Sequence, residues 1–585
     1  MRKSSYSPHR RSLPQFDRRL FTTDDRFSRI GSGELGGKAH GLARMHGILE
    51  PKLRESFEPA ITVCIPDLTV ITTEFFDLFL KENDLYEIAY SDVRDDLIAH
   101  AFIKADLPVR LVGDLRALVE QVHSPLAVRS SSMLEDAMFE PFASVYGTKM
   151  VPNNEPDADT RFRRLVEAVK LVYASTFFKV ARNYMKATHH TTLDEKMAVV
   201  IQETIGSRLG DRFYPTISGV LRSYNFYPVG YAKPEQGVAE LALGLGRTIV
   251  DEGISWAFSP AYPTIDPPFK SIGDRLKHTQ TGFWAINMRK TARFDPINEI
   301  EFLEKYKLAD AEYDGSLRSI ASTYVAQDDR VASGIWTAGP RIIDFAPILK
   351  DGVLPLPDLL ATVKKFCEDM LGAMVEIEFA IRLDPRGREP AKFGFLQVRP
   401  MVVSDAEVDL PESELAGEHV ILASEQALGN GVLDAITDVV YVDPERFDIM
   451  KTRQIAAELE PFNRTLVEAR KPYVLIGFGR WGTTDQAAGI PVDFGQISGA
   501  KVIVESALGD LRTSMSQGSH FFHNVTSFRI FYFSVPPESA YGIRWDRIAR
   551  ERIVSRSEFV VHAEFERPLR IKVDGRSGRG VITSE

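Results

Sequence analysis

The stretch VEIEFAIRLD, residues 375–384, alternates apolar and polar side chains without interruption. This period of two predicts a β-strand with one buried face. The opposite face then carries Glu376 and Glu378 side by side. The next residues, PRGREP (385–390), contain Pro and Gly and break the alternation, which is typical of a chain reversal.

A second strand is predicted to return over GFLQVRPM, residues 394–401, with Gln397 and Arg399 on one face. If the strands pair, Glu376, Glu378, Gln397 and Arg399 gather on one sheet face. The two carboxylates repel each other, so they need a cation nearby. A divalent metal ion carrying phosphate oxygens would supply it, and Arg399 would bind further phosphate charge. A solvated strand face with ordinary surface charges is the alternative interpretation.

The composition bounds the class of protein. The chain has 585 residues, enough for about three to four domains, and is ordinarily globular, with 44% hydrophobic and 26% charged residues. A net charge of -10 argues against general nucleic-acid binding. No apolar run approaches the ~18 residues that span a bilayer. The two cysteines, Cys64 and Cys367, exclude a disulfide framework, and residues 1–25 read as a disordered basic arm without the apolar core of a secretory signal. These features predict a cytoplasmic protein.

A glycine-rich loop lies near the N-terminus, in GSGELGGKAHGLARM (31–45). Gly36, Gly37 and Lys38 precede a helix-like run over residues 40–48. Backbone amides exposed by glycines beside a cation suit a phosphate. The loop is not a Walker A motif, because that motif's first glycine and the hydroxyl residue after its lysine are missing. A plain helix-entry loop is the alternative.

A second candidate phosphate contact lies in PLAVRSSS, residues 125–132. Its apolar start predicts a short buried strand that delivers Arg129 at its end, immediately before Ser130. An arginine beside hydroxyl groups can bind a polyphosphate with two parallel hydrogen bonds. The alternative is that Arg129 pairs only with the nearby Glu135 or Asp136.

Four segments, in this order, resemble the nucleotide-binding domain of the phosphoenolpyruvate synthase and pyruvate phosphate dikinase family: GGKAHGLARM (36–45), PLAVRSSSMLEDAMFEPFASVYGT (125–148), MAVVIQETI (197–205) and GFLQVRP (394–400). The resemblance implies an α+β chain with an ATP-grasp fold, in which two subdomains clasp ATP and magnesium. They are expected at residues 26–190 and 191–405, followed by a smaller α/β or α+β C-terminal domain at residues 406–585.

The resemblance also implies roles for individual residues. Lys38, Arg129 and Arg399 would be catalytic, the first two on the phosphates of ATP and Arg399 on the transferred phosphoryl group. Magnesium would be held by Glu376, Glu378 and Gln397. The nucleotide would be bound by Gly36, Gly37, Lys38, Arg129, Ser130, Gln202 at the adenine-side hinge, Glu240, Gly244 and Gly246 in a second glycine-rich segment, and Gln397.

The chain departs from the family pattern in three places. Glu376 and Ser144 stand where the family usually has Asp and Gly, and Arg222 and Ser223 replace a usual Phe-Thr pair. Residues 260–345 match poorly and are expected to be an insertion. It would be a lid or a substrate-specific surface, with an ordinary surface excursion as the alternative.

The C-terminal region lacks the sequence pattern of the family's phosphohistidine and phosphoenolpyruvate domains. GFGRWG (477–482) is a G-x-G-x-x-G after a predicted strand, but Gly489 and Pro491 interrupt the helix that a dinucleotide site requires. His520 and His523 would share a helix face as a partial metal site or a phosphate carrier. Two histidines in an aromatic core are the alternative.

Together these features predict a Mg-ATP-dependent phosphotransferase whose C-terminal domain presents the phosphate acceptor. The alternative is an ATP-binding regulatory or sensing module without transfer activity, because the phosphohistidine domain is missing. A dinucleotide-dependent enzyme is a third option. The sequence does not identify the acceptor or the phosphate transferred, and it leaves a homodimer open.

Overall fold

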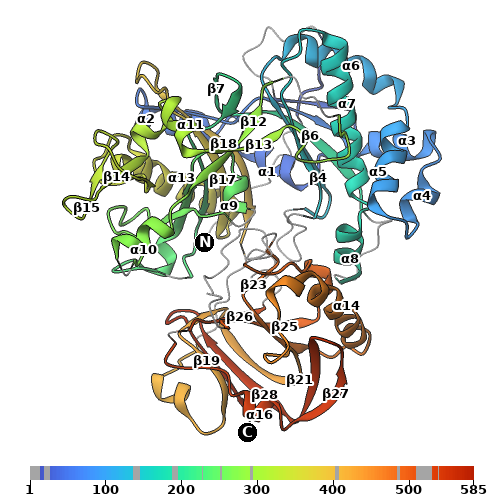
Figure 1. Cartoon of the computed structure of the whole chain (residues 1–585). Coiled ribbons are helices and arrows are strands. Elements are labelled where there is room, and N and C mark those ends of the chain that lie inside the picture. The colour runs from blue at the N-terminus through green and yellow to red at the C-terminus, as the bar shows by residue number, and fades with distance from the viewer. Residues whose placement is uncertain are drawn as a thin grey trace, which may run out of the picture.

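The computed structural model of the protein describes residues 13–18, 27–135, 145–187, 195–226, 228–250, 253–269, 271–289, 294–401, 408–483, 488–508, 530–537 and 539–584. Helices and strands are both abundant and form three parts (Figure 1), so the predicted α+β class is confirmed. We call these parts the N-terminal subdomain (mostly blue to teal), the central subdomain (mostly green to yellow) and the C-terminal domain (orange to red).

The N-terminal subdomain is a five-stranded sheet covered by helices. Its strands are, in spatial order, β1 (Phe27–Ile30), β3 (Leu68–Ile71), β6 (Met197–Glu203), β4 (Leu126–Ser132) and β5 (Thr148–Val151). Its helices are α3 (Thr73–Glu82), α4 (Tyr86–Tyr90), α5 (Asp95–Lys104), α6 (Val109–Gln121), α7 (Ala158–Ser175) and α8 (Lys179–Ala187). The serines after Arg129, predicted to follow a short strand, continue β4 and pair with β6.

Helix α7 shows why this part folds as it does. Its apolar residues recur every three or four positions, and Leu165, Ala168 and Val172 are fully buried. Asp157 caps the helix by accepting hydrogen bonds from two backbone N–H groups of the first turn. The chain then continues into a second helix, α8.

The central subdomain contains the predicted hairpin, which lies inside a six-stranded sheet. The strands are, in spatial order, β11 (Trp256–Phe258), β10 (Val238–Ala242), β9 (Ile217–Arg222), β17 (Val375–Arg382), β18 (Ala391–Pro400) and β2 (Ile61–Cys64). Helices associated with this sheet are α1 (Gly37–Met45), α2 (Leu49–Phe57), α12 (Ala346–Leu349) and α13 (Leu356–Leu371). Helix α1 packs on β18 and also contacts β4, so it lies between the two sheets.

The chain exchanges strands between the two subdomains. β6 hydrogen-bonds to β3 and β4, so it belongs to the N-terminal sheet although it lies beyond residue 190. β2 comes early in the chain but pairs with β18 in the central sheet. The strand pairing thus divides the subdomains after β6 rather than at residue 190. Residues 13–18, within the expected disordered arm, lie along β1, where the N–H of Phe16 donates to the carbonyl of Arg29 (2.7 Å).

Residues 260–345 contribute to two small sheets. Their strands are, in spatial order, β13 (Leu303–Lys307), β12 (Gly282–Asn287), β8 (Arg212–Tyr214) and β7 (Ser207–Leu209) in one, and β15 (Arg330–Ser333), β14 (Ala321–Val325) and β16 (Arg341–Ile343) in the other. Three further short helices belong to the central subdomain: α9 (Arg247–Val250), α10 (Ile272–Lys277) and α11 (Leu308–Tyr313).

The connection between β12 and β13 reaches across to the N-terminal subdomain. Lys149 of β5 donates to the carbonyl of Pro296 (2.8 Å) and pairs with the Glu301 carboxylate (2.8 Å). The N–H of Thr148 donates to Glu299 (2.7 Å). The Lys149–Glu301 pair is almost fully buried, with side-chain exposures of 1% and 4%. This connection therefore links the two subdomains through residues 296–301.

The C-terminal domain is a curled nine-stranded sheet. Its strands are, in spatial order, β19 (Val420–Ser424), β29 (Arg579–Ser584), β28 (Val560–Asp574), β21 (Gly431–Val442), β22 (Tyr473–Phe478), β25 (Ala500–Ser506), β26 (Phe531–Val535) and β20 (Gln426–Leu428), with β27 (Arg552–Arg556) on β28. β20 at one end also contacts β29 near the other, so the sheet closes around an apolar core. The helices are α14 (Thr452–Glu468) and α16 (Trp545–Ile548).

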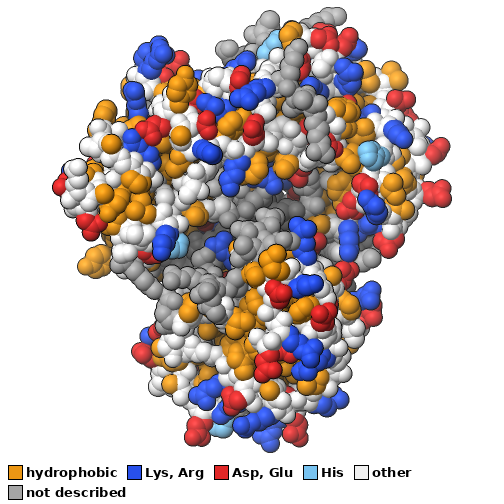
Figure 2. All heavy atoms as spheres, viewed as in Figure 1, with side chains coloured by type: hydrophobic (Ala, Val, Ile, Leu, Met, Phe, Trp, Pro, Cys, Tyr) orange, Lys and Arg blue, Asp and Glu red, His pale blue; other side chains and the backbone are white. Residues whose placement is uncertain are grey.

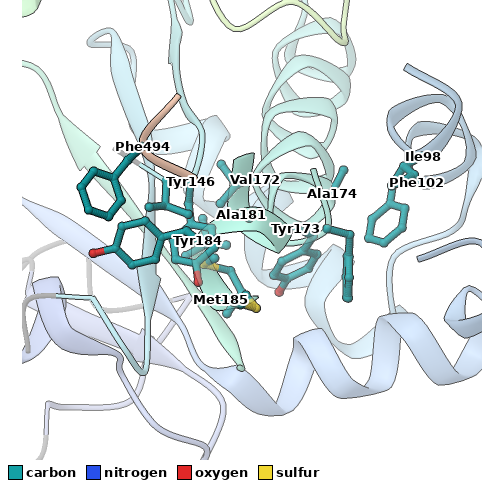
Figure 3. Packing of buried hydrophobic residues seen from close by; sticks show 14 of the residues in the cluster. Ile98, Phe102, Tyr146, Val172, Tyr173, Ala174, Ala181, Tyr184, Met185 and Phe494 are labelled. Atoms are coloured by element: carbon teal, nitrogen blue, oxygen red, sulfur yellow. The ribbon is translucent and has the colours of Figure 1, made fainter. Parts of the chain in front are cut away.

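The C-terminal domain packs against helix α8 of the N-terminal subdomain. The rings of Tyr184 and Phe494 lie 5.8 Å apart between their centroids, and Figure 3 shows Phe494 against this helix. A single apolar cluster includes buried residues of both parts. The face drawn in Figure 2 is hollowed where the three parts meet, with Lys and Arg side chains at the rim. No helix among the described residues is long and apolar enough to cross a membrane.

Candidate functional site

The hairpin brings together the four polar residues predicted to share a face. In the antiparallel pair β17–β18, Glu376 lies opposite Arg399 and Glu378 opposite Gln397. Residues directly opposite each other project from the same side of a sheet, so the predicted juxtaposition is confirmed. The register shifts by one residue immediately after Glu378.

This polar face is buried. Glu376, Gln397 and Arg399 are 2%, 2% and 3% exposed. The interpretation of the face as a solvated surface is therefore wrong, because the N-terminal subdomain covers part of it. Arg129 of β4 reaches over it and donates to Glu378 Oε2 (3.0 Å) and Gln397 Oε1 (2.7 Å).

The carboxylate of Glu376 is held by two arginines. Arg399 Nε donates to Oε1 (2.8 Å), and Arg222 Nε donates to Oε2 (2.8 Å). Arg222 also forms an ion pair with Glu240, whose second oxygen accepts from Ser255 Oγ (2.8 Å). Burial lowers the pKa of Arg222, but the Glu240 and Glu376 carboxylates outweigh it and raise that pKa. Arg222 and Arg399 thus supply the positive charge that the carboxylate of Glu376 was predicted to need.

The pairing of Arg129 differs from the local alternative. Its Nη2 binds Glu378 and Gln397, which follow it by 249 and 268 positions, and its Nη1 donates to the carbonyl of Leu396 (3.2 Å). The carboxylate of Glu135, its suggested local partner, instead accepts from Lys38. Arg129 therefore joins the N-terminal sheet to the hairpin.

The glycine loop places Lys38 beside β4. Gly36 has φ 74°, and a side chain there would lie 1.8 Å from the carbonyl oxygen of Ser131, so only glycine fits. Helix α1 begins at Gly37, three residues before the predicted start. Lys38 Nζ then donates to Glu135 Oε1 (2.6 Å) and Ser130 Oγ (3.2 Å).

A cavity of about 330 Å³ opens between the two subdomains at these side chains. Its charged lining residues are the cations Lys38, Arg129, Arg247 and Arg399 and the carboxylates Glu135, Glu203, Glu299 and Glu378, and the amide of Gln397 lies among the lining residues too. Its apolar part is lined by Met150, Ile205, Val220, Leu245 and Ile249. A pocket of this size, lined by apolar side chains and by convergent charges of both signs, is typical of a small-molecule site.

Residues 32–418, more than half of the chain, match the family model of the pyruvate phosphate dikinase AMP/ATP-binding domain. The chain belongs to this family. The resemblance predicted from the four sequence segments is confirmed, and the protein carries an AMP/ATP-binding domain of the pyruvate phosphate dikinase type. The match spans both subdomains around the cavity and ends just before β19, so the C-terminal domain lies outside it. No curated protein matches the chain.

The predicted nucleotide residues of this dikinase-type domain divide into two groups. Those that line the cavity are Lys38, Arg129, Gln202, Gly246 and Gln397, together with the predicted catalytic Arg399 and metal ligand Glu378. Those outside the cavity lining are Gly36, Gly37, Ser130, Glu240 and Gly244, together with the predicted metal ligand Glu376. Gly244, for example, has φ 85°, and a side chain there would lie 2.6 Å from the carbonyl oxygen of Trp284.

Three residues at or near the site of the dikinase-type domain were not predicted in their roles. Arg222 was noticed as a departure but not as a charge partner, and Tyr146 and Glu195 were not singled out. Tyr146 lines the cavity and donates to Glu195 Oε2 (2.7 Å). Burial raises the pKa of Glu195 to about 7, and the charge of Glu135 adds to the shift. No local pattern in the sequence marks these partners, because Tyr146 and Glu195 lie outside the strands and β9, which carries Arg222, is buried along its whole length.

The oxygen donors of the site fit a metal ion shared with a ligand. Within the described ranges, no three His, Cys, Asp or Glu side chains come together as a metal cluster. Glu378 and Gln397 both line the cavity, and magnesium is commonly bound by one or two protein oxygens together with substrate phosphates. These two residues thus fit such an ion, whereas Glu376 is engaged by its arginines.

The glycines of the C-terminal G-x-G-x-x-G have a structural explanation. After Gly479 the chain forms β23 (Arg480–Trp481) and β24 (Gly489–Ile490), and the described residues up to β25 contain no α-helix. A side chain at Gly477 would lie 2.3 Å from the Trp481 ring. The expected break in the helix is confirmed, which removes the support for a dinucleotide site. His520 and His523 lie outside the described residues, as does Ser144.

Proposed function

We propose that the protein is a Mg-ATP-dependent phosphotransferase that binds ATP in the cavity between its two subdomains, in the manner of an ATP-grasp enzyme. The observation that carries the proposal is the convergence of Lys38, Arg129 and Arg399 on one cavity from three elements, α1, β4 and β18. Family membership supports the nucleotide as ligand.

The charges of the site support binding of a polyphosphate. The cations Lys38, Arg129 and Arg399 each have a carboxylate partner, which is Glu135, Glu378 and Glu376, respectively. A triphosphate would compete for these cations with charge-assisted hydrogen bonds. The apolar lining residues, together with Gln202, would take the base.

Glu378 and Gln397 would hold magnesium, which when bound neutralises charge on the phosphates. Lys38 and Arg129 would orient the phosphate chain in a site shielded from water. Arg399 would donate hydrogen bonds to the phosphoryl group as charge develops on its oxygens. The acceptor would approach from the side of the C-terminal domain, which lies outside the matched family range.

A sensing module that binds ATP without transfer is the second candidate. It is motivated by the C-terminal domain, a curled sheet that lies outside the matched family range and lacks the sequence pattern of the family's phosphohistidine domain. The two candidates share the same cavity and differ in whether ATP is consumed.

Phosphorus NMR of the purified protein with Mg-ATP and a pool of metabolites tests this choice. We expect loss of ATP, formation of AMP or ADP and a new phosphate ester. Arg399→Lys, chosen because truncation to Ala would remove a partner of the buried Glu376, should lower the rate by about tenfold or more. Arg382→Lys is the matched control, because Arg382 lies on the same hairpin but pairs with the exposed Glu389.

Tight ATP binding without any turnover would favour sensing and refute transfer. Equal rates for the Arg399→Lys and wild-type proteins would remove Arg399 from the mechanism. Absence of ATP binding would refute the proposed site altogether.

A further inference from the structure

Four charged side chains of alternating sign lie across four adjacent strands of the central sheet. They are Glu240 on β10, Arg222 on β9, Glu376 on β17 and Arg399 on β18, and we call them the charge ladder. Arg222 lies directly opposite Glu376 in the strand register. Ion pairs join each member of the ladder to the next.

The side chains in the interior of the charge ladder are buried away from solvent. The side chains of Glu240, Arg222 and Glu376 are 3%, 4% and 2% exposed. Both oxygens of Glu376 accept from arginines, and the oxygens of Glu240 accept from Arg222 and Ser255. Two carboxylates and two guanidinium groups make the ladder neutral, so a divalent cation placed there would add uncompensated buried charge.

Glu378, two residues along β17, has a different environment. Its side chain is 20% exposed, lines the cavity and accepts from Arg129. A metal ion bound there can keep water and phosphate oxygens as ligands, as magnesium prefers. The two carboxylates of the hairpin, which look equivalent in the sequence, are therefore not equivalent as metal ligands.

We infer that the guanidinium group of Arg222 takes the place of a metal ion beside Glu376. The nucleotide site then binds one divalent ion, at Glu378 and Gln397. Arg222 acts as a positioning residue. It keeps Glu376 neutralised when Arg399, the one member of the ladder that lines the cavity, turns toward a phosphate. The inference rests on the proposed nucleotide site and deepens it.

Counting bound Mn²⁺ by electron paramagnetic resonance, with a saturating non-hydrolysable ATP analogue, tests the inference. We expect one Mn²⁺ per chain in the wild-type protein. Arg222→Phe, which restores the residue type usual in the family at this position, should take up a second ion between Glu240 and Glu376. Arg222→Lys, which keeps the charge, should bind one. Two ions in the wild-type protein, or one in Arg222→Phe, would overturn the inference.

A second pair of variants keeps the test decisive if Arg222→Phe does not fold. Glu376→Gln preserves the shape of the ladder and should change Mn²⁺ affinity by less than about threefold, whereas Glu378→Gln should lower it by about tenfold or more. A loss in Glu376→Gln equal to that in Glu378→Gln would show that Glu376 is a ligand and refute the inference. Analogue binding is measured separately by calorimetry. No binding would refute the nucleotide site itself, while binding with two ions would refute only the one-ion inference.

Discussion

Replacing Lys38 by Met separates the contribution of this lysine to folding from its contribution to nucleotide binding. Lys38 Nζ lies 2.6 Å from Glu135 Oε1, and the side chains are 15% and 2% exposed. Removing one partner of a buried ion pair typically costs about 3–5 kcal/mol. Glu135 keeps hydrogen bonds from Ser130 Oγ (2.9 Å) and the N–H of Ser132 (2.8 Å). We therefore expect a loss of about 2–3 kcal/mol in the free energy of unfolding.

The double variant Lys38→Met/Glu135→Gln removes the buried charge as well as its partner. Its stability should return to within about 1 kcal/mol of wild type, because the amide oxygen can accept from the N–H of Ser132 while the amide nitrogen donates to Ser130 Oγ. Nucleotide affinity should not return. A hydrogen bond from a charged donor contributes about 1.5–3 kcal/mol, so both variants should bind the ATP analogue about 10- to 150-fold more weakly.

Urea denaturation gives the stabilities, and calorimetric titration with the magnesium complex of a non-hydrolysable ATP analogue gives the affinities. Lys196→Met is the matched control, since Lys196 pairs with Asp77 at the surface, with exposures of 49% and 45%. Its effect should be below about 1 kcal/mol, with unchanged affinity. Wild-type affinity in the double variant would refute a phosphate contact by Lys38. Unchanged stability in Lys38→Met would refute the buried pair.

Three further predictions follow from individual contacts. Glu195 has a pKa of about 7 in the folded protein against a usual 4.5, so its protonated form stabilises the fold and stability falls as pH rises from 4.5 through 7. Urea denaturation at several pH values measures this decrease in the free energy of unfolding, and Glu195→Gln should remove up to about 3 kcal/mol of it. The same pH dependence in the variant and the wild-type protein would contradict the raised pKa of Glu195. Gly36→Ala should destabilise by about 2 kcal/mol or more and weaken nucleotide binding, whereas Gly210→Ala, whose added methyl meets no atom within 4 Å, should leave binding unchanged. Lys149→Met should lower the free energy of unfolding by about 3 kcal/mol, because it leaves the buried carboxylate of Glu301 without its partner. The double variant Lys149→Met/Glu301→Leu should recover most of that stability. Equal losses in the two variants would show that the charge of Glu301 does not cause the destabilisation.

Local patterns in the sequence were enough to determine the hairpin. The alternation of residues 375–384 predicts which side chains share a face, because the period of a strand is a property of the backbone alone. Gly36, Gly37 and Lys38 likewise mark the start of a helix. The order of the four family segments then identifies the domain, and the family match confirms it. Nothing beyond the sequence was needed for these conclusions.

The partners of the charged side chains were decided only by the tertiary structure. Arg129 binds Glu378, 249 positions away, rather than the nearby Glu135, and Arg222 binds Glu376, 154 positions away. These contacts arise because β4 and β9 are brought to the hairpin by sheet packing and strand order, which no local periodicity encodes. The assignment of β6 to the N-terminal sheet has the same origin. Glu376 and Glu378 are alike in sequence, but one lies between two buried arginines and the other lines the cavity, and this difference in solvation determines which of them can meet a ligand.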